Sequence, residues 1–357
     1  MSEPVRHLFL SEYLTSGLWP TDEALPNSLA REGRAMLETV ARDFLALEKS
    51  RLFLTWDARL ELPELGCQWQ APEPDSPGVD MFRSTCGRVQ VLRVASNAAA
   101  EEWFEILSEP FEFRLVIAPE FDSLLSDRLV VTERNPELVS LNVTREAAEL
   151  CADKYLIGEL LQQHSVACIP GWLDPADIPA TQRRVVVKPR WGAGSQEIAT
   201  VTREHAQQFH DGKHLFQPVV EGIPLSAAAI FDDGFQLKQV WPPTQQHLSE
   251  DGAYCYLGGS IPFTGVTQRQ VDALVARVAE HVPGLRGYVG FDFILTPDGE
   301  LVLVEINPRL TTSYVGYRAL SNISLAPWLI PQNVPTELPP FSGHVEFSPS
   351  GTIQLHS

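Results

Sequence analysis

Residues 290–309, GFDFILTPDGELVLVEINPR, contain two apolar segments joined by a Pro-Asp-Gly turn. This pattern predicts a β-hairpin that would place Asp292 and Glu305 side by side at its open end. Two carboxylates and the amide oxygen of Asn307 form the hard, all-oxygen ligand set that suits Mg²⁺. Arg309 adds a fixed cation that can fork onto phosphoryl oxygens. The stretch therefore predicts a site for a magnesium-bound phosphate compound. An amphipathic hairpin with solvated acids is the alternative.

A second stretch, residues 184–197 (RVVVKPRWGAGSQE), precedes the hairpin in the chain. Its apolar strand ends at Lys188, and a loop with Gly192, Gly194 and Ser195 follows. Glycines let backbone N–H groups approach phosphate oxygens closely, while a lysine supplies a point charge. The lysine precedes the glycines, so this is not a Walker loop. We expect a phosphate-binding lid here, and a plain hairpin turn is the alternative.

A third stretch, residues 215–222 (LFQPVVEG), is an apolar strand interrupted by a proline. The interruption exposes backbone groups with which a flat base could pair. Taken alone, such a segment is more often an edge strand or a crossover between domains.

Composition and charge narrow the class of protein. The chain has 357 residues, a length typical of two to three domains, and a net charge of −19 that disfavours nonspecific binding to nucleic acid. Its five cysteines are odd in number and scattered, which favours reduced thiols in the cytoplasm. We find no signal-peptide pattern and no apolar run of membrane-spanning length.

The N-terminal part, residues 1–118, alternates predicted strands with helices. Strands are expected at 52–55, 89–95 and 113–117, and an apolar helical stripe covers 36–45. This alternation predicts a small parallel α/β domain. A glycine-rich dinucleotide fingerprint is missing from the segment, so NAD binding is not expected.

Two α+β lobes are expected to follow, at residues 119–215 and 216–330. The first lobe should begin with a helix that Thr144 caps and that continues to about Gln163. The tail, residues 331–357, has several prolines and little periodicity and is predicted to be extended.

The order of these motifs resembles the ATP-grasp superfamily, over about residues 144–320. A lysine expected on a helix (Lys154) comes first, and the Lys188 strand, the glycine loop, the proline-interrupted linker and the carboxylate hairpin follow. The resemblance implies an ATP-grasp fold of mixed α/β and α+β class, in which two lobes clasp ATP. Residues 1–118 would be the Rossmann-like pre-ATP-grasp domain.

The resemblance also implies roles for individual residues. Lys154 and Lys188 would contact the phosphates and the base edge of ATP, and Arg309 would act at the transferring γ-phosphoryl group together with Lys188. The ATP-binding residues would be Lys154, Lys188, Gly192, Gly194, Ser195, Gln217, Pro218, Val219, Val220 and Glu221. Asp292, Glu305 and Asn307 would hold Mg²⁺, for which Mn²⁺ can substitute. Many members have an acid that grips the ribose where this chain has Pro224, and Glu221 is a candidate replacement.

Several segments are similar to the branch that contains tyramine–glutamate ligase of methanofuran biosynthesis, a pathway of one-carbon metabolism. They include residues 11–17 (SEYLTSG), 256–262 (YLGGSIP) and 311–314 (TTSY). By this resemblance glutamate would supply the carboxylate and tyramine, tyrosine or a related primary amine the nitrogen. The expected substrate residues are His247, Tyr254, Tyr256, Gly258 and Gly259, and core packing is an equal alternative for the tyrosines.

The activity implied by the resemblance is ATP-dependent amide formation through an acyl phosphate. The motifs supply cations, amides and metal ligands without an obvious nucleophile, which suits positioning and charge neutralisation. Expected partners are a small carboxylate and a small amine, without nucleic acid or membrane, and a homodimer is left open. Other amino-acid or peptide ligases of the superfamily, carboxylases, phosphoryl-transfer enzymes and a non-catalytic ATP-binding regulatory protein are the alternatives.

Overall fold

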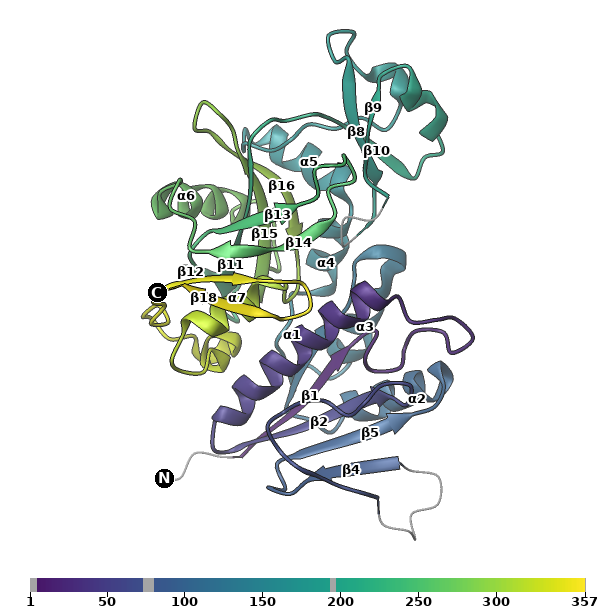
Figure 1. The fold of residues 1–357 in the computed structure, drawn as a ribbon, viewed down its shortest axis with the longest axis vertical. Coiled ribbons are helices and arrows are strands. Elements are labelled where there is room, and N and C mark those ends of the chain that lie inside the picture. The colour runs from purple at the N-terminus through teal and green to yellow at the C-terminus, as the bar shows by residue number, and fades with distance from the viewer. Residues whose placement is uncertain (1–4, 73–79, 193–196, 357) are drawn as a thin grey trace.

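The computed structural model describes residues 5–72, 80–192 and 197–356, which form three β-sheets with helices packed around them. An N-terminal α/β domain lies at one end of the molecule in Figure 1, and a small three-stranded unit lies at the other. An eight-stranded sheet, which carries most of the C-terminal half of the chain, lies between them.

The N-terminal domain has a seven-stranded sheet in the order β3-β4-β5-β2-β1-β6-β7. Its strands are β1 (Arg6–Glu12), β2 (Ser50–Asp57), β3 (Trp69–Gln70), β4 (Asp80–Ser84), β5 (Val89–Val94), β6 (Phe113–Ile117) and β7 (Val139–Ser140). Neighbouring strands in the series β5-β2-β1-β6-β7 are parallel. At one edge of the sheet, β4 is antiparallel to both β5 and β3. The three predicted strands are therefore confirmed, and the sheet continues past the predicted boundary at residue 118.

Helices cover both faces of this sheet, namely α1 (Asn27–Ala46), α2 (Asn97–Ser108) and α3 (Leu124–Glu133). Side chains alternate along β1. Leu8 and Leu10 share one buried cluster with Met36 and Val40 of α1, whereas Phe9 shares the other with Phe104 of α2. This alternation fixes the direction in which β1 ends, at Glu12.

The helix predicted from Thr144 to about Gln163 is divided into α4 (Arg145–Ala152) and α5 (Lys154–Gln163). Thr144 caps α4 as expected, because its hydroxyl accepts a hydrogen bond from Ala147 N. The division occurs at Asp153, whose carboxylate accepts bonds from the first amides of α5 and forms an ion pair of 2.6 Å with Arg190. The prediction of one continuous helix was wrong, since a buried N-cap residue starts a new one.

The small unit is an antiparallel sheet of β8 (Arg184–Pro189), β9 (Ala199–Thr202) and β10 (His214–Pro218), in the order β10-β8-β9. Short 3-10 turns occur there and elsewhere, at Phe121–Ser123, Pro175–Asp177, His205–Phe209, Ala326–Leu329 and Pro331–Asn333. The unit has its own buried cluster around Val187 and Phe216. It therefore packs independently of the main sheet and projects from it (Figure 1).

The eight-stranded sheet has the order β16-β15-β11-β13-β14-β17-β18, with β12 paired to β11. Its strands are β11 (Ile223–Phe231), β12 (Leu237–Val240), β13 (Thr244–Leu248), β14 (Tyr256–Ile261), β15 (Gly287–Leu295), β16 (Leu301–Asn307), β17 (His344–Phe347) and β18 (Ile353–His356), and its helices are α6 (Gln268–Ala279) and α7 (Ser313–Leu320). The tail was predicted to be extended without regular pairing, but β17 pairs with β14 and forms a hairpin with β18. Four-residue strands are too short to show periodicity in sequence, which explains the error.

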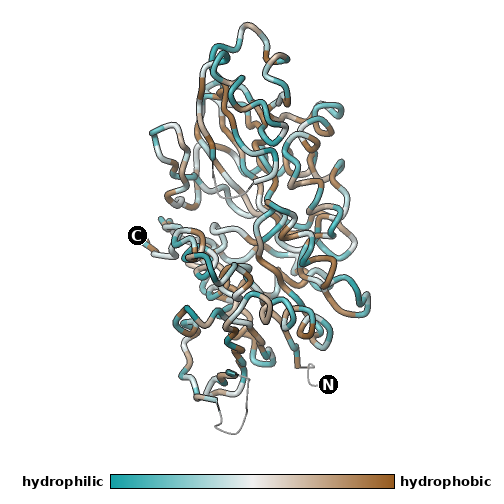
Figure 2. The backbone as a smooth tube through the Cα atoms, turned by 90° about the vertical axis from the view of Figure 1, so that its right-hand side faces the viewer, coloured by the Kyte–Doolittle hydropathy of each residue, from teal (hydrophilic) through white to brown (hydrophobic). Residues whose placement is uncertain are grey.

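Apolar segments run through the middle of the molecule and polar segments mark its outer loops (Figure 2). Two large buried clusters each combine residues of the N-terminal domain with residues of the C-terminal sheet. Among the described residues, no helix is both long enough and apolar enough to cross a lipid bilayer.

Candidate active site

The carboxylate hairpin forms as predicted. Strands β15 and β16 are antiparallel, and Asp292 lies directly opposite Glu305. Asp292 Oδ2 accepts a hydrogen bond of 2.8 Å from Asn307 Nδ2, and Asp292 Oδ1 accepts one of 2.9 Å from Gln246 Nε2 on β13. Because the nitrogen of the Asn307 amide faces Asp292, its oxygen is the atom left to meet a ligand.

Two lysines approach this pair from the small unit and from α5. Lys154 Nζ lies 3.6 Å from Glu305 Oε2 and donates a hydrogen bond to the carbonyl of Gly192. The break at Asp153 makes Lys154 the first residue of α5, so its position depends on that break. Lys188, at the end of β8, is 5% exposed and lines the cavity in front of the hairpin.

Burial and neighbouring charges set the protonation of these groups. Burial and the adjacent Glu305 carboxylate raise the pKa of Asp292. Burial would also raise the pKa of Glu305, but Lys154 and Lys188 outweigh it and hold that pKa below its usual value. Burial lowers the pKa of Lys188 to about 8, and the charge of Glu305 opposes that shift. The two carboxylates therefore repel one another, and a cation between them would relieve the repulsion.

Arg309 follows the hairpin and is held by the N-terminal domain. Its Nε lies 2.9 Å from Glu120 Oε1, and its Nη2 donates a hydrogen bond of 3.2 Å to Glu120 Oε2. Glu120 is 6% exposed and follows β6 in the chain. This partner was not predicted, because a single acid in a connecting loop has no motif around it.

One cavity gathers most of the predicted residues. Those that line it are Lys188, Gln217, Pro218, Val219, Val220, Tyr254, Tyr256, Asp292, Glu305, Asn307 and Arg309. Sequence reasoning missed other lining residues, among them Glu32 of α1, Gln246 and Thr312. The linker and the apolar side chains near it form one part of the wall, and the carboxylates and cations form another. The cations, the carboxylates and the Asn307 amide in this wall suit the binding and charge neutralisation of a phosphate compound.

Other predicted residues lie elsewhere. Glu221 is exposed and does not line the cavity, whereas Pro224 does. His247 Nε2 is 3.2 Å from Ser260 Oγ, and its side chain does not line the cavity. Gly258 and Gly259 do not line it either.

These two glycines have a packing role instead. A Cβ on Gly258 would come within 2.0 Å of the carbonyl oxygen of Phe347, and one on Gly259 would meet Gln245 O at 2.7 Å. They allow β14 to pack closely against its neighbours. Gly192 lies beside Lys154, while Gly194 and Ser195 lie outside the described residues.

The chain is similar to a known domain family and to named relatives. Residues 151–313 match the ATP-grasp domain model. The chain is 23% identical to the tyramine–L-glutamate ligase of Methanocaldococcus jannaschii over 307 residues, which is 85% of this chain and 83% of the relative. It is 28% identical to a D-alanine–D-alanine ligase of Nitratidesulfovibrio vulgaris over 196 residues, or 48% of this chain and 62% of the relative.

A solved structure supports the fold. The chain superimposes on a putative ATP-grasp superfamily protein from Archaeoglobus fulgidus with a TM-score of 0.66 at 23% identity, covering 96% of this chain and 92% of the other. The matched domain includes Lys154, Lys188 and the carboxylate hairpin. By the matched domain and by its fold, the chain contains an ATP-grasp domain at residues 151–313, and the named relatives above are ligases.

Proposed function

We propose that the protein joins the carboxylate of glutamate to an aromatic primary amine such as tyramine, with ATP as the energy source. One observation carries the ligase chemistry: Lys188, Asp292, Glu305 and Arg309 all line one cavity. The choice of substrates follows the tyramine–L-glutamate ligase relative, which aligns with 85% of this chain.

In this proposal ATP lies along the cavity. The linker residues Gln217 to Val220 bracket adenine, because an interrupted strand offers backbone groups to the base edge. Lys154 and Lys188 meet the phosphates, and the loop that begins at Gly192 covers them. Gly194 and Ser195 belong to that loop in the proposal. The adenine site would then be at one end of the cavity and Arg309 at the other.

Asp292, Glu305 and Asn307 would hold Mg²⁺. The raised pKa of Asp292 supports this assignment, because two buried carboxylates that lie opposite each other in a hairpin favour a shared cation. Their oxygens and the amide oxygen of Asn307 are ligands of the type Mg²⁺ takes. When bound, the ion would neutralise charge on the ATP phosphates.

The reaction proceeds in two balanced steps. An oxygen of the glutamate carboxylate takes the γ-phosphoryl group, the bond from that phosphorus to ADP breaks, and an acyl phosphate forms. The amine nitrogen then bonds to the acyl carbon, the carbon–oxygen bond to phosphate breaks, and the nitrogen loses a proton. Arg309 lies where it could stabilise charge on the transferring group, and a closed loop would protect the acyl phosphate from water.

The test is incubation of the protein with ATP, Mg²⁺, glutamate and a panel of amines, with ADP release coupled to mass detection of amides. A product that joins glutamate to an aromatic amine supports the proposal. Amide formation with D-alanine alone would replace it with the activity named for the second relative. ATP binding without ADP release in any mixture would point to a regulatory protein.

We also infer that the protein acts in the cytoplasm. All five of its cysteines are free, and Cys86 and Cys255 are exposed. Exposed thiols persist in a reducing compartment, where ATP is also available.

A further inference from the structure

A second, smaller cavity adjoins the first. It lies between the N-terminal domain and the end of the carboxylate hairpin, and Glu32 and Arg309 line both cavities. Glu12, at the end of β1, lies in its wall. We call it the Glu12 cavity. A molecule bound there would have one end beside Arg309, next to the site proposed for the phosphoryl group.

Two acidic side chains, Glu12 and Glu32, lie in the wall of this cavity. Glu12 is 3% exposed, and its carboxylate accepts hydrogen bonds of 3.2 Å from Leu14 N and 2.8 Å from Thr15 N. Glu32 accepts a hydrogen bond from the hydroxyl of Thr312. Among the described residues of the wall, Arg309 is the one cation, and it is already paired with Glu120. Two acids beside one paired cation disfavour an anionic ligand and favour an ammonium group, because the charge of an ammonium group stabilises the ionised form of Glu12, whose pKa burial raises to about 7.

Apolar and aromatic side chains form the rest of the wall, including those of Tyr13, Trp19, Leu29, Met36 and Phe121. A ligand with only polar groups would leave this surface unpaired, so the cavity suits a ligand with an apolar ring. Within the described structure, Trp19 Nε1 is buried without a hydrogen-bond partner. Buried indole N–H groups normally find an acceptor, and here a ligand oxygen could provide it.

We propose that the Glu12 cavity binds the amine substrate, an aromatic primary amine that carries a hydroxyl group and no carboxylate. Its amino group lies toward Glu12 and Arg309, and its hydroxyl oxygen accepts a hydrogen bond from Trp19 Nε1. The inference rests on the proposed ligase function and goes beyond it, because it assigns the amine to a separate cavity and excludes tyrosine in favour of tyramine.

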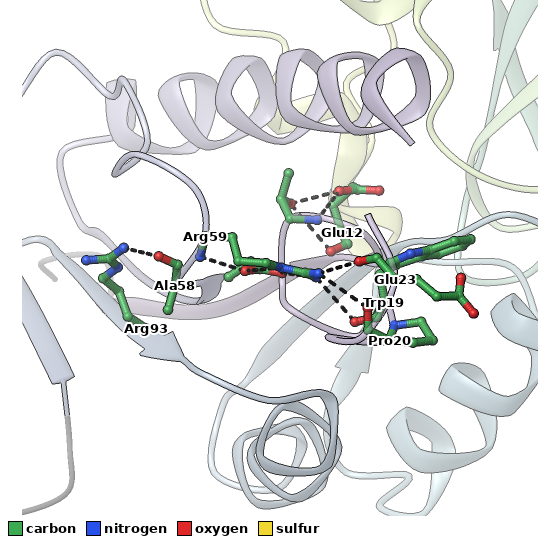
Figure 3. A network of polar contacts seen from close by, with 9 residues as sticks. Glu12, Trp19, Pro20, Glu23, Ala58, Arg59 and Arg93 are labelled. Atoms are coloured by element: carbon green, nitrogen blue, oxygen red, sulfur yellow. Dashed lines mark hydrogen bonds and ion pairs between the residues drawn. The ribbon is translucent and has the colours of Figure 1, made fainter. Parts of the chain in front are cut away.

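The segment that forms the wall is fixed to the sheet. Arg59 forms an ion pair of 2.7 Å with Asp57 and donates hydrogen bonds to the carbonyl oxygens of Trp19, Pro20 and Glu23 (Figure 3). These bonds hold residues 19–23 to the end of β2. The wall is therefore held before a ligand arrives, which reduces the entropy lost on binding.

Glu12 is also held by close packing. A Cβ on Gly33 of α1 would lie 2.4 Å from both Glu12 Cδ and Glu12 Oε1. The carboxylate therefore packs against the backbone of α1, while the hydrogen bonds from Leu14 N and Thr15 N hold its oxygens. This fixed orientation suits a group that positions an ammonium ion.

The test separates amine binding from carboxylate activation. Hydroxylamine is small enough to capture an acyl phosphate without using the cavity wall, and the product is a hydroxamate. In Glu12→Gln, the KM for tyramine should rise about ten- to a hundredfold, as expected for loss of a charge-assisted contact. Hydroxamate formation from ATP, glutamate and hydroxylamine should remain within twofold of the wild-type rate. Glu23→Gln, an exposed acid in the same segment, is the matched control and should leave both values unchanged.

A second variant keeps the test decisive if Glu12→Gln does not fold. Wild-type enzyme should prefer tyramine over phenethylamine by about two- to tenfold in kcat/KM, and Trp19→Phe should bring this ratio close to one. Tyrosine should be a poor substrate for the wild type. Two results would overturn the assignment. One is that the KM for tyramine is unchanged in Glu12→Gln and the preference for tyramine over phenethylamine is unchanged in Trp19→Phe. The other is that the wild-type enzyme uses tyrosine efficiently. Absence of hydroxamate with wild-type enzyme would instead overturn the proposed function itself.

Discussion

Arg309 and Glu120 form a buried ion pair, with Nε 2.9 Å from Oε1, that links the end of the carboxylate hairpin to the N-terminal domain. Arg309 lines both cavities, so the pair lies where the proposed nucleotide and amine sites meet. The N-terminal domain therefore contributes to the proposed reaction centre, although the matched ATP-grasp domain begins only at residue 151.

Glu120→Gln should reduce kcat about ten- to a hundredfold while the KM for ATP changes little, because Arg309 loses the carboxylate that orients it. It should also lower the free energy of unfolding by about 1–3 kcal/mol, since a buried guanidinium keeps only a neutral acceptor. Steady-state kinetics and urea unfolding measure both effects. Glu105→Gln removes a half-exposed partner of Arg134 and should change stability by less than about 0.5 kcal/mol. Equal effects of the two variants would contradict the role given to Glu120.

Asp292→Asn should abolish ADP release if Asp292 holds the metal. The free energy of unfolding without ATP and Mg²⁺ should stay equal or rise, because the repulsion between the two buried carboxylates is removed. Activity assays and thermal unfolding without metal measure the two effects. Asp298→Asn, in the turn of the same hairpin, should leave both unchanged, since Asp298 bonds only locally to Thr296. Turnover of Asp292→Asn within about tenfold of wild type, a barrier change near 1.4 kcal/mol, would refute the metal assignment.

Much of the site could be predicted from short segments of sequence. Asp292 and Glu305 come close because a tight turn joins their two strands, and a bulge between Asp292 and Phe293 then shifts the register so that Glu305, rather than Val304, lies opposite Asp292. Lys188 lies near the end of an apolar strand, so its place at one end of the small sheet also follows from a local pattern. These relationships depend on residues that are near one another in the chain.

Relationships between distant segments could not be predicted. Glu12, Glu32 and Glu120 reach Arg309 only through the packing of the N-terminal domain against the hairpin. In the sequence each is a single acid with nothing beside it to indicate a partner almost two or three hundred residues away. The division of the helix at Asp153 is similar, because this N-cap residue also forms an ion pair with Arg190, which lies outside the helix.

The buried Glu12 should make stability depend on pH. Burial raises its pKa from 4.5 to about 7, despite hydrogen bonds from Thr15 and Leu14 that oppose the shift. Between these values the folded protein holds a proton that the unfolded chain has lost, so the free energy of unfolding falls as pH rises. The difference in unfolding free energy between wild type and Glu12→Gln should therefore fall by about 3 kcal/mol between pH 4 and pH 8. Urea unfolding at a series of pH values measures it, and a constant difference would contradict the raised pKa.

Two glycine substitutions test the packing behind Glu12. Alanine normally stabilises a helix interior by about 1 kcal/mol relative to glycine. At Gly158 of α5 the nearest atoms to a new Cβ would be 3.9 Å away, so Gly158→Ala should show that gain. At Gly33 of α1 the new Cβ would overlap the Glu12 carboxylate, so Gly33→Ala should instead destabilise the protein by about 1–3 kcal/mol.

The same overlap gives Gly33→Ala a functional signature. The displaced Glu12 carboxylate would meet the amine substrate poorly, so the KM for tyramine should rise while hydroxamate formation from hydroxylamine is kept. Gly158→Ala should leave both kinetic values unchanged, because α5 is not part of the Glu12 cavity. Urea unfolding and the two kinetic assays distinguish the variants. A stabilising Gly33→Ala would show that the carboxylate can move freely, and the held orientation inferred for Glu12 would then be wrong.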